Sequence, residues 1–464
     1  MRPGRAYRGM NTPICDFVAA YRRRKPVRLH MPGHKGRCFL GCEPADITEI
    51  DGADWLYAPT GVIAQSQRNA AGLFGAGSTL YATGGSSQCI RAMLYLAVLR
   101  ARQRYPGQRP VVVAGRNAHR AFLTAAALLD LDVRWLYPPP GEGSLCRCPI
   151  PPHRLADALA QEPYPAAVYI TSPDYLGNTA DIPALGAVAH RQGVPLLVDN
   201  AHGAYLAFLS PSRHPLALGA DLCCDSAHKT LPVLTGGAYL HIAPTAPPEF
   251  SAHGGAAMAL FGSTSPSYLI LQSLDKANAY LAQGYPRRLA EATAHIAGLK
   301  ARLSRQGWAF SGDEPLKITV DGRSRGYTGQ ALAAALEAQG ITAEYAGPDY
   351  LVLMPTPENP PGDLSLLEQA LSQLSQRPPL PPLAEAPPLP APPRQVLSIR
   401  QAMFSPQETL PLDQAVGRVA ASPQVSCPPA VAPLVPGEEI PPAAAAVCRY
   451  YGISRLAVVA PGGP

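Results

Sequence analysis

One lysine of this chain stands in a setting unlike that of an ordinary surface lysine. Lys229 lies in the segment Asp225–Thr230, directly after the apolar run Leu222–Cys224, and Ser226 and His228 flank it. Lysine is the side chain whose primary amine can form a Schiff base with an aldehyde cofactor. Most lysines are solvated surface charges, so this position alone is weak evidence, and other residues must supply the rest of such a site.

A carboxylate thirty positions before Lys229 could serve the ring of an aromatic cofactor. Asp199 follows the apolar run Pro195–Val198, so we expect it at the carboxyl end of a strand. A carboxylate there can pair with a pyridinium nitrogen, which keeps the ring protonated and able to accept the electrons of a carbanion. The alternative is an aspartate that caps the following helix, and the sequence around Asp199 does not decide between them.

A glycine- and serine-rich turn could bind a phosphate. Gly84-Gly85-Ser86-Ser87 opens the helical pattern Ser87–Arg104. Free backbone N–H groups and the helix dipole make such a helix start an anion site, and Ser226 could add a second hydroxyl to it. The same four residue types are common in turns, so the motif has low specificity.

A histidine completes the set of residues that could hold an aromatic cofactor. His119 follows the strand predicted at Val111–Ala114, and an imidazole at a strand end can stack on a cofactor ring; an ordinary partly buried histidine is the alternative. Phosphate turn, stacking histidine, ring-nitrogen aspartate and Schiff-base lysine each follow an apolar strand. Their order and placement predict pyridoxal 5'-phosphate (PLP) as the cofactor.

These residues lie in a region where short apolar runs alternate with helical patterns, from about residue 65 to 285. Such alternation predicts an α/β fold with a mostly parallel sheet, on which ligands bind at the carboxyl ends of the strands. The strands are predicted at 111–114, 167–170, 195–198, 222–224 and 238–242, and two of the helices at 87–104 and 182–192.

The length of 464 residues, with 47% hydrophobic and 16% charged residues, suits several packed domains and excludes global disorder. After the major domain, helical and strand patterns (strands at 316–320 and 350–354) predict a smaller α+β domain, and a run of prolines predicts an extended linker. The predicted parts are an N-terminal arm with loops (1–60), the PLP-binding major domain (61–285), the small α+β domain (286–376), the linker (377–395) and a C-terminal module (396–464).

Composition also argues against several partners. The net charge of +6 is not gathered in a long run, and the cluster Arg22–Lys25 is interpreted as a solvated arm, so we expect no nucleic-acid partner. No apolar stretch has membrane-spanning length, no secretory signal is evident, and the ten cysteines lack a disulfide-type spacing. We therefore expect a reduced, cytoplasmic protein with no membrane partner. The spacing of His30, His34, Cys38 and Cys42 would suit a metal on a helix, but intervening prolines and glycines disfavour that helix, so we expect no metal site.

With these residues in view, the chain resembles the Orn/Lys/Arg decarboxylase family of fold-type I PLP enzymes. The most specific matching segments are His30–Gly36 (HMPGHKG) and Ser226–Leu231 (SAHKTL). Further matching segments are 46–76, 116–120, 171–173, 198–204, 265–268, 273–275, 415–419 and 436–440. The chain resembles the short form of the family, which lacks an N-terminal wing domain.

The resemblance implies a role for each candidate residue. Lys229 would form the Schiff base, Asp199 would pair with the ring nitrogen, and His119 would stack on the ring. The phosphate would be held beside Gly85 by the hydroxyl groups of Ser86, Ser87 and Ser226. His228 would flank the cofactor, and His202 would lie near the edge of its ring. The resemblance also implies a homodimer or larger homo-oligomer with active sites at the subunit interface, where Thr264 and Ser265 could reach a neighbour's phosphate.

Three positions depart from the family pattern. Asn200 stands where similar sequences often carry Glu, Cys89 stands where a small Gly is common, and Cys427–Val431 is a degraded form of the family's PPGIP-like C-terminal stretch. The C-terminal changes leave the substrate specificity open.

The implied activity is decarboxylation of a small-molecule substrate, arginine, lysine or ornithine, to agmatine or a diamine. Lys229 or a histidine such as His228 would return a proton to the α-carbon. Asp54, Glu438 and Glu439 are candidates for reading the basic side chain, without discrimination among them.

Two other functions stay open. An aminotransferase or another fold-type I reaction is one, with Arg323 and Arg325 available for a carboxylate but without a supporting motif. A non-catalytic PLP-binding protein is the other, and the joint presence of Lys229, Asp199 and His119 argues against it.

Overall fold

A computed structural model describes residues 9–381, 392–423, 425 and 429–462. The chain divides into two compact units, each built from two separate stretches. Unit 1 comprises Met1–Arg104 and Ile182–Leu289, and unit 2 comprises Tyr105–Asp181 and Ala290–Pro464. The main sheet has seven strands in the order β1-β7-β6-β5-β4-β2-β3. Among the described pairings of this sheet, those of β7 with β1 and with β6 are antiparallel and the others are parallel. This confirms the predicted α/β fold with a mostly parallel sheet.

The four sheet strands of unit 1 are short, and three of them are fully buried. Every residue of β5, β6 and β7 is buried, as expected for apolar runs covered on both faces of a sheet. In the parallel pair β5–β6, Asp199 lies opposite Cys224, so both strands end at the same edge. The strands of unit 1 are β1 (Ser78–Ala82), β5 (Leu196–Asp199), β6 (Leu222–Asp225) and β7 (Ala238–Ile242).

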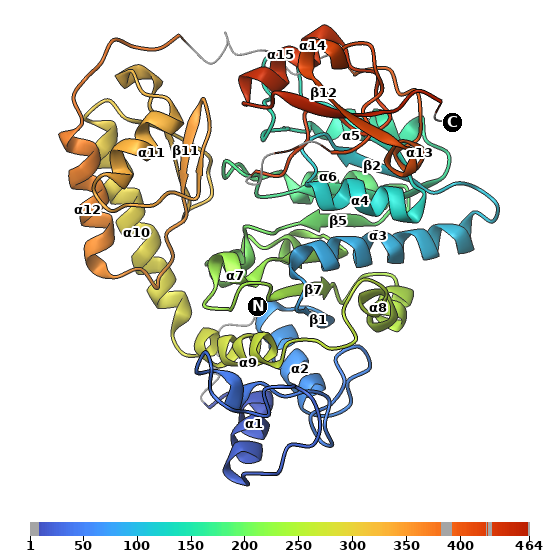
Figure 1. The fold of residues 1–464 in the computed structure, drawn as a ribbon, viewed down its shortest axis with the longest axis vertical. Helices are drawn as coiled ribbons and strands as arrows, with labels where there is room; N and C mark the ends of the chain where they lie inside the picture. Colours follow the sequence, from blue (N-terminus) through green and yellow to red (C-terminus); the bar gives the residue numbers. More distant parts are fainter. Residues whose placement is uncertain (1–8, 382–391, 424, 426–428, 463–464) are drawn as a thin grey trace. The chain divides into compact units, whose positions relative to one another are not determined.

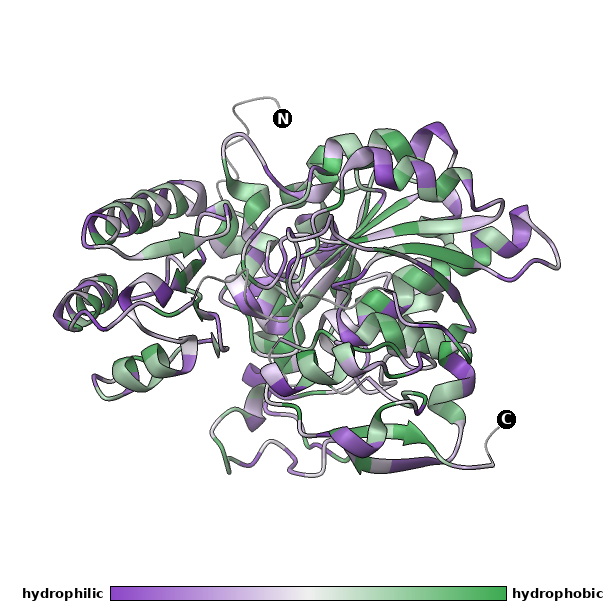
Figure 2. Ribbon diagram, turned by 90° about the horizontal axis from the view of Figure 1, so that it is seen from above, coloured by the Kyte–Doolittle hydropathy of each residue, from purple (hydrophilic) through white to green (hydrophobic). Residues whose placement is uncertain are grey.

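Figure 2 shows helices that carry both hydrophobic and hydrophilic residues along their length, and a helix on which the two alternate periodically can pack an apolar face inward. The long helix α3 packs against β6, β7 and α8 (Figure 1). The helices are α1 (Pro13–Arg23), α2 (Val62–Phe74), α3 (Gly85–Arg104), α6 (Ile182–Arg191), α7 (Ala227–Thr230), α8 (Pro248–Leu260) and α9 (Tyr268–Ala282), with the 3-10 turns η1 (Glu43–Ala45), η2 (Ala204–Phe208) and η3 (Pro215–Leu218); α10 (Tyr285–Ser304) starts in unit 1 and continues in unit 2.

Unit 2 contains the remaining strands of the main sheet and a second, antiparallel sheet. In the main sheet, β2 pairs in parallel with both β3 and β4. The second sheet has the order β10-β11-β9-β8, and α11 packs against β11 (Figure 1). The elements are β2 (Val111–Gly115), α4 (Arg120–Leu129), β3 (Asp132–Leu136), α5 (Pro152–Ala160), β4 (Pro165–Thr171), β8 (Ala309–Ser311), β9 (Ile318–Asp321), η4 (Arg323–Arg325), α11 (Gly329–Glu337), β10 (Tyr345–Ala346), β11 (Tyr350–Leu353) and α12 (Pro361–Gln373).

The last part of unit 2 has a small hydrophobic core of its own, which includes Leu412, Ile440 and Val458. Its elements are α13 (Ile399–Phe404), β12 (Gln407–Pro411), α14 (Leu412–Ala415), α15 (Pro442–Tyr450) and β13 (Arg455–Val459), with β12 antiparallel to β13. Residues 382–391 of the predicted linker, Cys427 of the divergent C-terminal stretch, and residues 1–8 lie outside the described residues. None of the helices described here combines the length and the apolar character needed to cross a membrane.

Candidate active site

The predicted phosphate turn lies between β1 and α3, where two loops approach closely. Gly85 has a φ of +70° and donates its N–H to the carbonyl oxygen of Gly236 at 2.8 Å. Gly236 itself has a φ of +97°, and a Cβ there would lie 2.9 Å from the carbonyl oxygen of Thr83. Only glycine combines this backbone conformation with this approach, so the turn is fixed against the loop that follows Lys229.

Two hydroxyl groups meet at the start of this helix. Ser226 is buried, and its Oγ donates to Oγ of Ser86 at 2.7 Å. Ser86 and Ser87 are the second and third residues of α3, a helix of 20 residues. The positive end of the helix dipole, unpaired first-turn N–H groups and serine hydroxyls together suit a phosphate.

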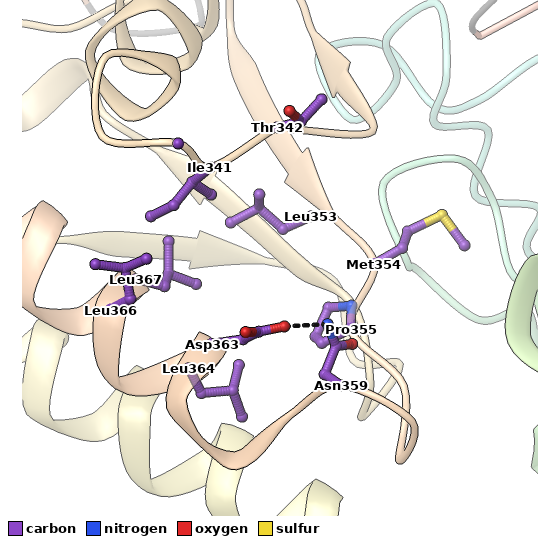
Figure 3. Close-up of a pocket in the computed structure, with 11 residues that line it drawn as sticks. Ile341, Thr342, Leu353, Met354, Pro355, Asn359, Asp363, Leu364, Leu366 and Leu367 are labelled. Carbon is purple, nitrogen blue, oxygen red and sulfur yellow. Dashed lines mark hydrogen bonds between the residues drawn. The ribbon is translucent and has the colours of Figure 1, made fainter.

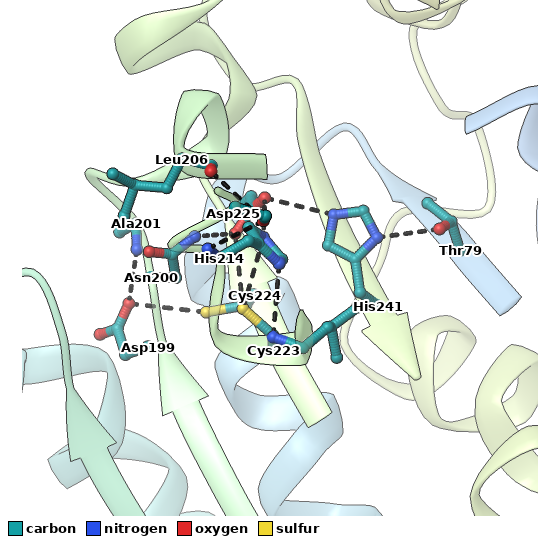
Figure 4. Close-up of polar contacts among 12 residues, drawn as sticks. Thr79, Asp199, Asn200, Ala201, Leu206, His214, Cys223, Cys224, Asp225 and His241 are labelled. Carbon is teal, nitrogen blue, oxygen red and sulfur yellow. Dashed lines mark hydrogen bonds and ion pairs between the residues drawn. The ribbon is translucent and has the colours of Figure 1, made fainter. Parts of the chain in front are cut away.

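Asp199 is the last residue of β5 and is buried. Its Oδ1 accepts from the N–H of Ala201 at 3.2 Å and from the thiol of Cys224 at 3.5 Å (Figure 4). The next helical turn, η2, begins only at Ala204. Asp199 therefore does not cap that turn, and its carboxylate stands at a strand end, where the sequence places a partner for a ring nitrogen.

Lys229 lies on α7, a single helical turn that directly follows β6. Its Nζ is 3.0 Å from Nε2 of His202, which is buried, and Lys229 itself is half-buried. A buried imidazole beside the amine gives Lys229 a neighbour with which it can exchange a proton.

The neighbouring His228 is engaged by the backbone. Its Nδ1 lies 2.9 Å from the carbonyl oxygen of Gly237 and must donate to it. Burial lowers the pKa of His228, and the nearby Lys229 lowers it further, against the hydrogen bond to Gly237. A neutral His228 with its proton on Nδ1 follows from these contacts.

His119 belongs to unit 2, where it is the N-cap of α4. Its Nδ1 accepts from the N–H of Ala121 at 3.1 Å, so a neutral ring carries its proton on Nε2. The backbone of His119 forms a bridge with Val431, and the N–H of Arg120 donates to the carbonyl oxygen of Ala430. Among the predicted site residues of unit 1, the structure therefore places Ser86 in contact with Ser226, and His202 in contact with Lys229. His119 belongs to unit 2.

The polar groups of the candidate site in unit 1 match the polar parts of PLP. The start of α3 with Ser86 and Ser226 suits the phosphate, the amine of Lys229 suits the aldehyde, and the carboxylate of Asp199 suits the ring nitrogen.

One buried residue beside these groups was not assigned a role from the sequence. Asp225 ends β6, is 0% exposed, and accepts hydrogen bonds from Asn200 (Nδ2, 2.7 Å), His214 (Nε2, 3.0 Å) and His241 (Nε2, 3.2 Å) (Figure 4). Burial raises its pKa, but His214 and His241 lower it by more, so the net pKa is below the ordinary value. Its partners come from three separate segments, so no local sequence signal could have revealed them.

The acidic residues considered for substrate recognition have other partners. Asp54 accepts from the backbone N–H groups of Gly61 at 2.8 Å and Ile63 at 3.0 Å at the start of α2. Glu438 is buried 3.6 Å from Arg116, and Glu439 lies 3.9 Å from Arg394. These contacts give Asp54 and Glu438 structural roles.

The arginines of the aminotransferase alternative also bind within the small domain. Arg323 pairs with Asp349 at 2.8 Å. Arg325 donates to the carbonyl oxygens of Gln306 and Leu374, the latter at 2.8 Å. Both guanidinium groups therefore already bind groups of the protein, and neither arrangement resembles a binding site for a substrate carboxylate.

The four-residue spacing of histidine and cysteine near the N-terminus does not lie on a helix. Residues 24–42 form turns and loops, His34 bonds to Asp46 at 3.2 Å, and His30 contacts the hydroxyl of Tyr21 at 2.7 Å. The absence of a helix there agrees with the prediction from the prolines and glycines.

A cavity of about 260 Å³ lies in the small domain, away in sequence from the predicted site residues. Figure 3 shows Ile341, Leu353 and Leu367 lining it, with Asn359 and Asp363 joined by a hydrogen bond of 2.9 Å. No predicted cofactor residue is among those that line it.

Comparison with known proteins identifies the family to which the chain is similar. A family model described as "Orn/Lys/Arg decarboxylase, major domain" matches residues 12–322, and one described as "Orn/Lys/Arg decarboxylase, C-terminal domain" matches residues 392–460. An arginine decarboxylase of Bacillus subtilis (strain 168) is 29% identical over 465 residues, which cover 92% of this chain and 91% of the relative. An uncharacterized protein of the same strain, YaaO, is 30% identical over 364 residues, 74% of each chain.

Solved structures share the fold. The lysine decarboxylase LdcF of Francisella novicida superimposes with a TM-score of 0.78 at 16% identity, covering 97% of this chain and 82% of that chain. The constitutive lysine decarboxylase of E. coli gives a TM-score of 0.74 at 18% identity, with the same coverage.

Proposed function

We propose that this chain, which belongs to the Orn/Lys/Arg decarboxylase family, decarboxylates a basic amino acid with PLP held covalently by Lys229. The family is PLP-dependent. One observation carries the proposal: Ser226, whose hydroxyl meets Ser86 at the start of α3, stands only three residues before Lys229. A single turn of chain thus carries both a phosphate ligand and the amine for the aldehyde.

Different residues of unit 1 would perform different parts of the reaction. When bound, PLP supplies a ring that accepts the electron pair of the bond between the α-carbon and the carboxylate, so that carbon dioxide leaves. Asp199, buried at its strand end, would hold a proton on the ring nitrogen. Lys229 would then deliver a proton to the α-carbon, and His202, 3.0 Å from its Nζ, would exchange that proton. His228 is less suited, because its Nδ1 is engaged by Gly237.

For the substrate, we infer arginine as the first amino acid to test, with agmatine as product. Several curated relatives that cover most of the chain are arginine decarboxylases. Lysine and ornithine are the other two basic candidates within the family name.

The test is to incubate PLP-loaded protein with each basic amino acid and to measure carbon dioxide and amine by mass spectrometry. We expect wild-type protein to release both, and Lys229→Ala to lose turnover by at least about 1,000-fold together with the visible absorbance of lysine-bound PLP. Lys276→Ala, which changes an exposed lysine on α9, is the matched control and should keep activity. Formation of the oxo acid instead of carbon dioxide would favour the aminotransferase alternative, and normal decarboxylation by Lys229→Ala would refute the proposal.

We further propose a homodimer or larger homo-oligomer. Four large apolar side chains in the N-terminal loops are exposed, which is costly for a lone protomer: Val27 (84%), Leu29 (92%), Phe39 (76%) and Leu40 (89%). Light scattering of the purified chain should give at least twice the mass of 49.0 kDa, and a monomer at micromolar concentration would contradict the proposal.

A further inference from the structure

The carboxyl ends of β5 and β6 carry two aspartates that face opposite sides of the sheet. Asp199 lies opposite Cys224 in the register and accepts from its thiol. Asp225 is one residue further along β6, so its side chain points to the other face, where the register also places His241 beside Cys223. Figure 4 shows Asp225 at the centre of the contacts on that face.

The histidines around Asp225 act as hydrogen-bond donors. The N–H of Leu216 donates to Nδ1 of His214, and Nδ1 of His241 lies 2.8 Å from the hydroxyl of Thr79. Because the carboxylate of Asp225 can only accept, Nε2 of His214 carries a proton and donates it to Asp225 at 3.0 Å.

In the structure, hydrogen bonds join the same residues to one another. His214, Cys223 and Asp225 lie close together. Asp225 accepts from Nε2 of His214 at 3.0 Å and from the thiol of Cys223 at 3.5 Å. These three residues thus belong to one hydrogen-bond network.

Asn200 links this network to the candidate active site. Its Nδ2 donates to Oδ1 of Asp225 at 2.7 Å, and both residues are 0% exposed. Its Oδ1 is buried and has no hydrogen-bond partner among the described residues. A Cβ at residue 203 would lie 2.0 Å from that oxygen, so Gly203 leaves just enough room for the carboxamide.

We propose that Asp225 is a positioning residue for the reaction, acting through Asn200. The hydrogen bond between Asn200 and Asp225, here called the bridge, joins the residue after Asp199 to the residue before Ser226. It therefore holds the ends of β5 and β6 together, at the place where Asp199 ends β5 and where Ser226 and Lys229 follow β6. This inference rests on the proposed function, because it assigns Asp225 a task in orienting the groups that hold PLP.

Exchange of the two side chains across the bridge tests the proposal. Asn200→Asp alone sets two carboxylates in contact, and we expect kcat to fall about 100-fold with KM changed less than about 3-fold, because misplaced catalytic groups affect the chemical step. Asp225→Asn alone should lower kcat about 10-fold. The double variant N200D/D225N restores one amide and one carboxylate, and should recover kcat to within about 3-fold of wild type together with the wild-type absorbance of lysine-bound PLP.

A matched control lies at the opposite end of the same strand. Asp221 precedes β6, is buried and pairs with the exposed His190 at 2.8 Å, so Asp221→Asn also alters an aspartate–histidine contact of this strand. We expect it to lower thermal stability without changing kcat or the PLP absorbance. If Asn200→Asp does not fold, Asn200→Ala replaces it, with an expected loss of about 10-fold in kcat.

The outcomes separate this inference from the proposed function. Wild-type protein that binds no PLP or releases no carbon dioxide would overturn the function itself. Single variants that keep wild-type kcat and PLP absorbance, or a double variant that is no better than Asn200→Asp, would overturn the positioning role alone.

Discussion

At the scale of single residues, the contact between Ser226 and Ser86 makes a direct prediction about PLP affinity. Removal of one hydroxyl from an anion site loses a hydrogen bond to a charged group, which is worth about 1.5–3 kcal/mol. We expect Ser226→Ala to raise the Kd for PLP at least about 10-fold, measured by fluorescence titration of the apoprotein.

Ser398→Ala is the matched serine control. Ser398 caps α13 by accepting from the N–H of Gln401 at 3.1 Å, so its loss should cost about 1 kcal/mol of stability and leave the Kd unchanged. An unaltered Kd in Ser226→Ala would remove Ser226 from the phosphate site.

Single residues also show how much of the candidate site could be predicted from the sequence. The placement of Asp199 and Lys229 at or just after strand ends could be predicted, because an apolar run followed by a polar residue is a local pattern. The network around Asp225 could not, because Asn200, His214 and His241 meet it only through strand register and loop packing.

At the scale of elements, helix α2 depends on a carboxylate outside it. Asp54 accepts from the N–H groups of Thr60, Gly61, Ile63 and Ala64, between 2.8 and 3.3 Å. Burial raises the pKa of Asp54, but the backbone donors, Thr60 first, lower it by more, so the folded pKa lies below 3.8. A carboxylate at the start of a helix also interacts favourably with the positive end of the helix dipole.

This geometry predicts a pH-dependent effect of Asp54→Asn. A carboxyl whose pKa is lowered on folding stabilises the protein above its unfolded pKa, and that stabilisation disappears as the pH falls through the folded value. Chemical denaturation should show wild type more stable by about 1–2 kcal/mol at pH 7, with the difference shrinking below about pH 4. A difference that grows in acid would contradict this role.

Among the elements, the sequence predicted the buried strands better than the exposed ones. The runs at 195–198, 222–224 and 238–242 correspond to β5, β6 and β7, whose residues are all buried. Strand β12 (QETLP) carries no such signal, because its residues are half-buried or exposed and it exists through pairing with β13. Apolar composition reports burial rather than strand pairing.

At the scale of the whole molecule, a buried arginine adds side-chain contacts to the backbone contacts of His119 and Arg120 that join the C-terminal part of unit 2 to the segment after β2. Arg116 donates to the carbonyl oxygens of Ala432 and Pro433, each at 2.9 Å, and pairs with Glu438 at 3.6 Å. Burial raises the pKa of Glu438, which Arg116 partly opposes.

Arg116→Ala should therefore destabilise the protein by about 3–5 kcal/mol, because it leaves a buried carboxyl and two carbonyl groups without their partner. Limited proteolysis should cut the variant faster than wild type and release the C-terminal part. Arg400→Ala, which removes the contacts of an exposed arginine to the carbonyl oxygens of Ala127 and Leu128, should change stability by less than about 0.5 kcal/mol. Equal behaviour of the two variants would show that Arg116 does not hold this attachment.

The whole-molecule organisation was the hardest level to predict. The family and the α/β class followed from motifs and apolar patterning, and both are confirmed. The division into two units, each built from stretches separated in the sequence, could not be predicted, because it depends on contacts between residues far apart in the chain.

The central claim is that PLP is bound covalently by Lys229, and borohydride trapping tests it most directly. PLP-loaded protein is reduced, digested and analysed by mass spectrometry, so that the modified lysine is identified by its peptide. We predict a pyridoxyl group on Lys229 at near one equivalent per chain. A modification confined to other lysines, or spread evenly over the exposed ones, would contradict the account.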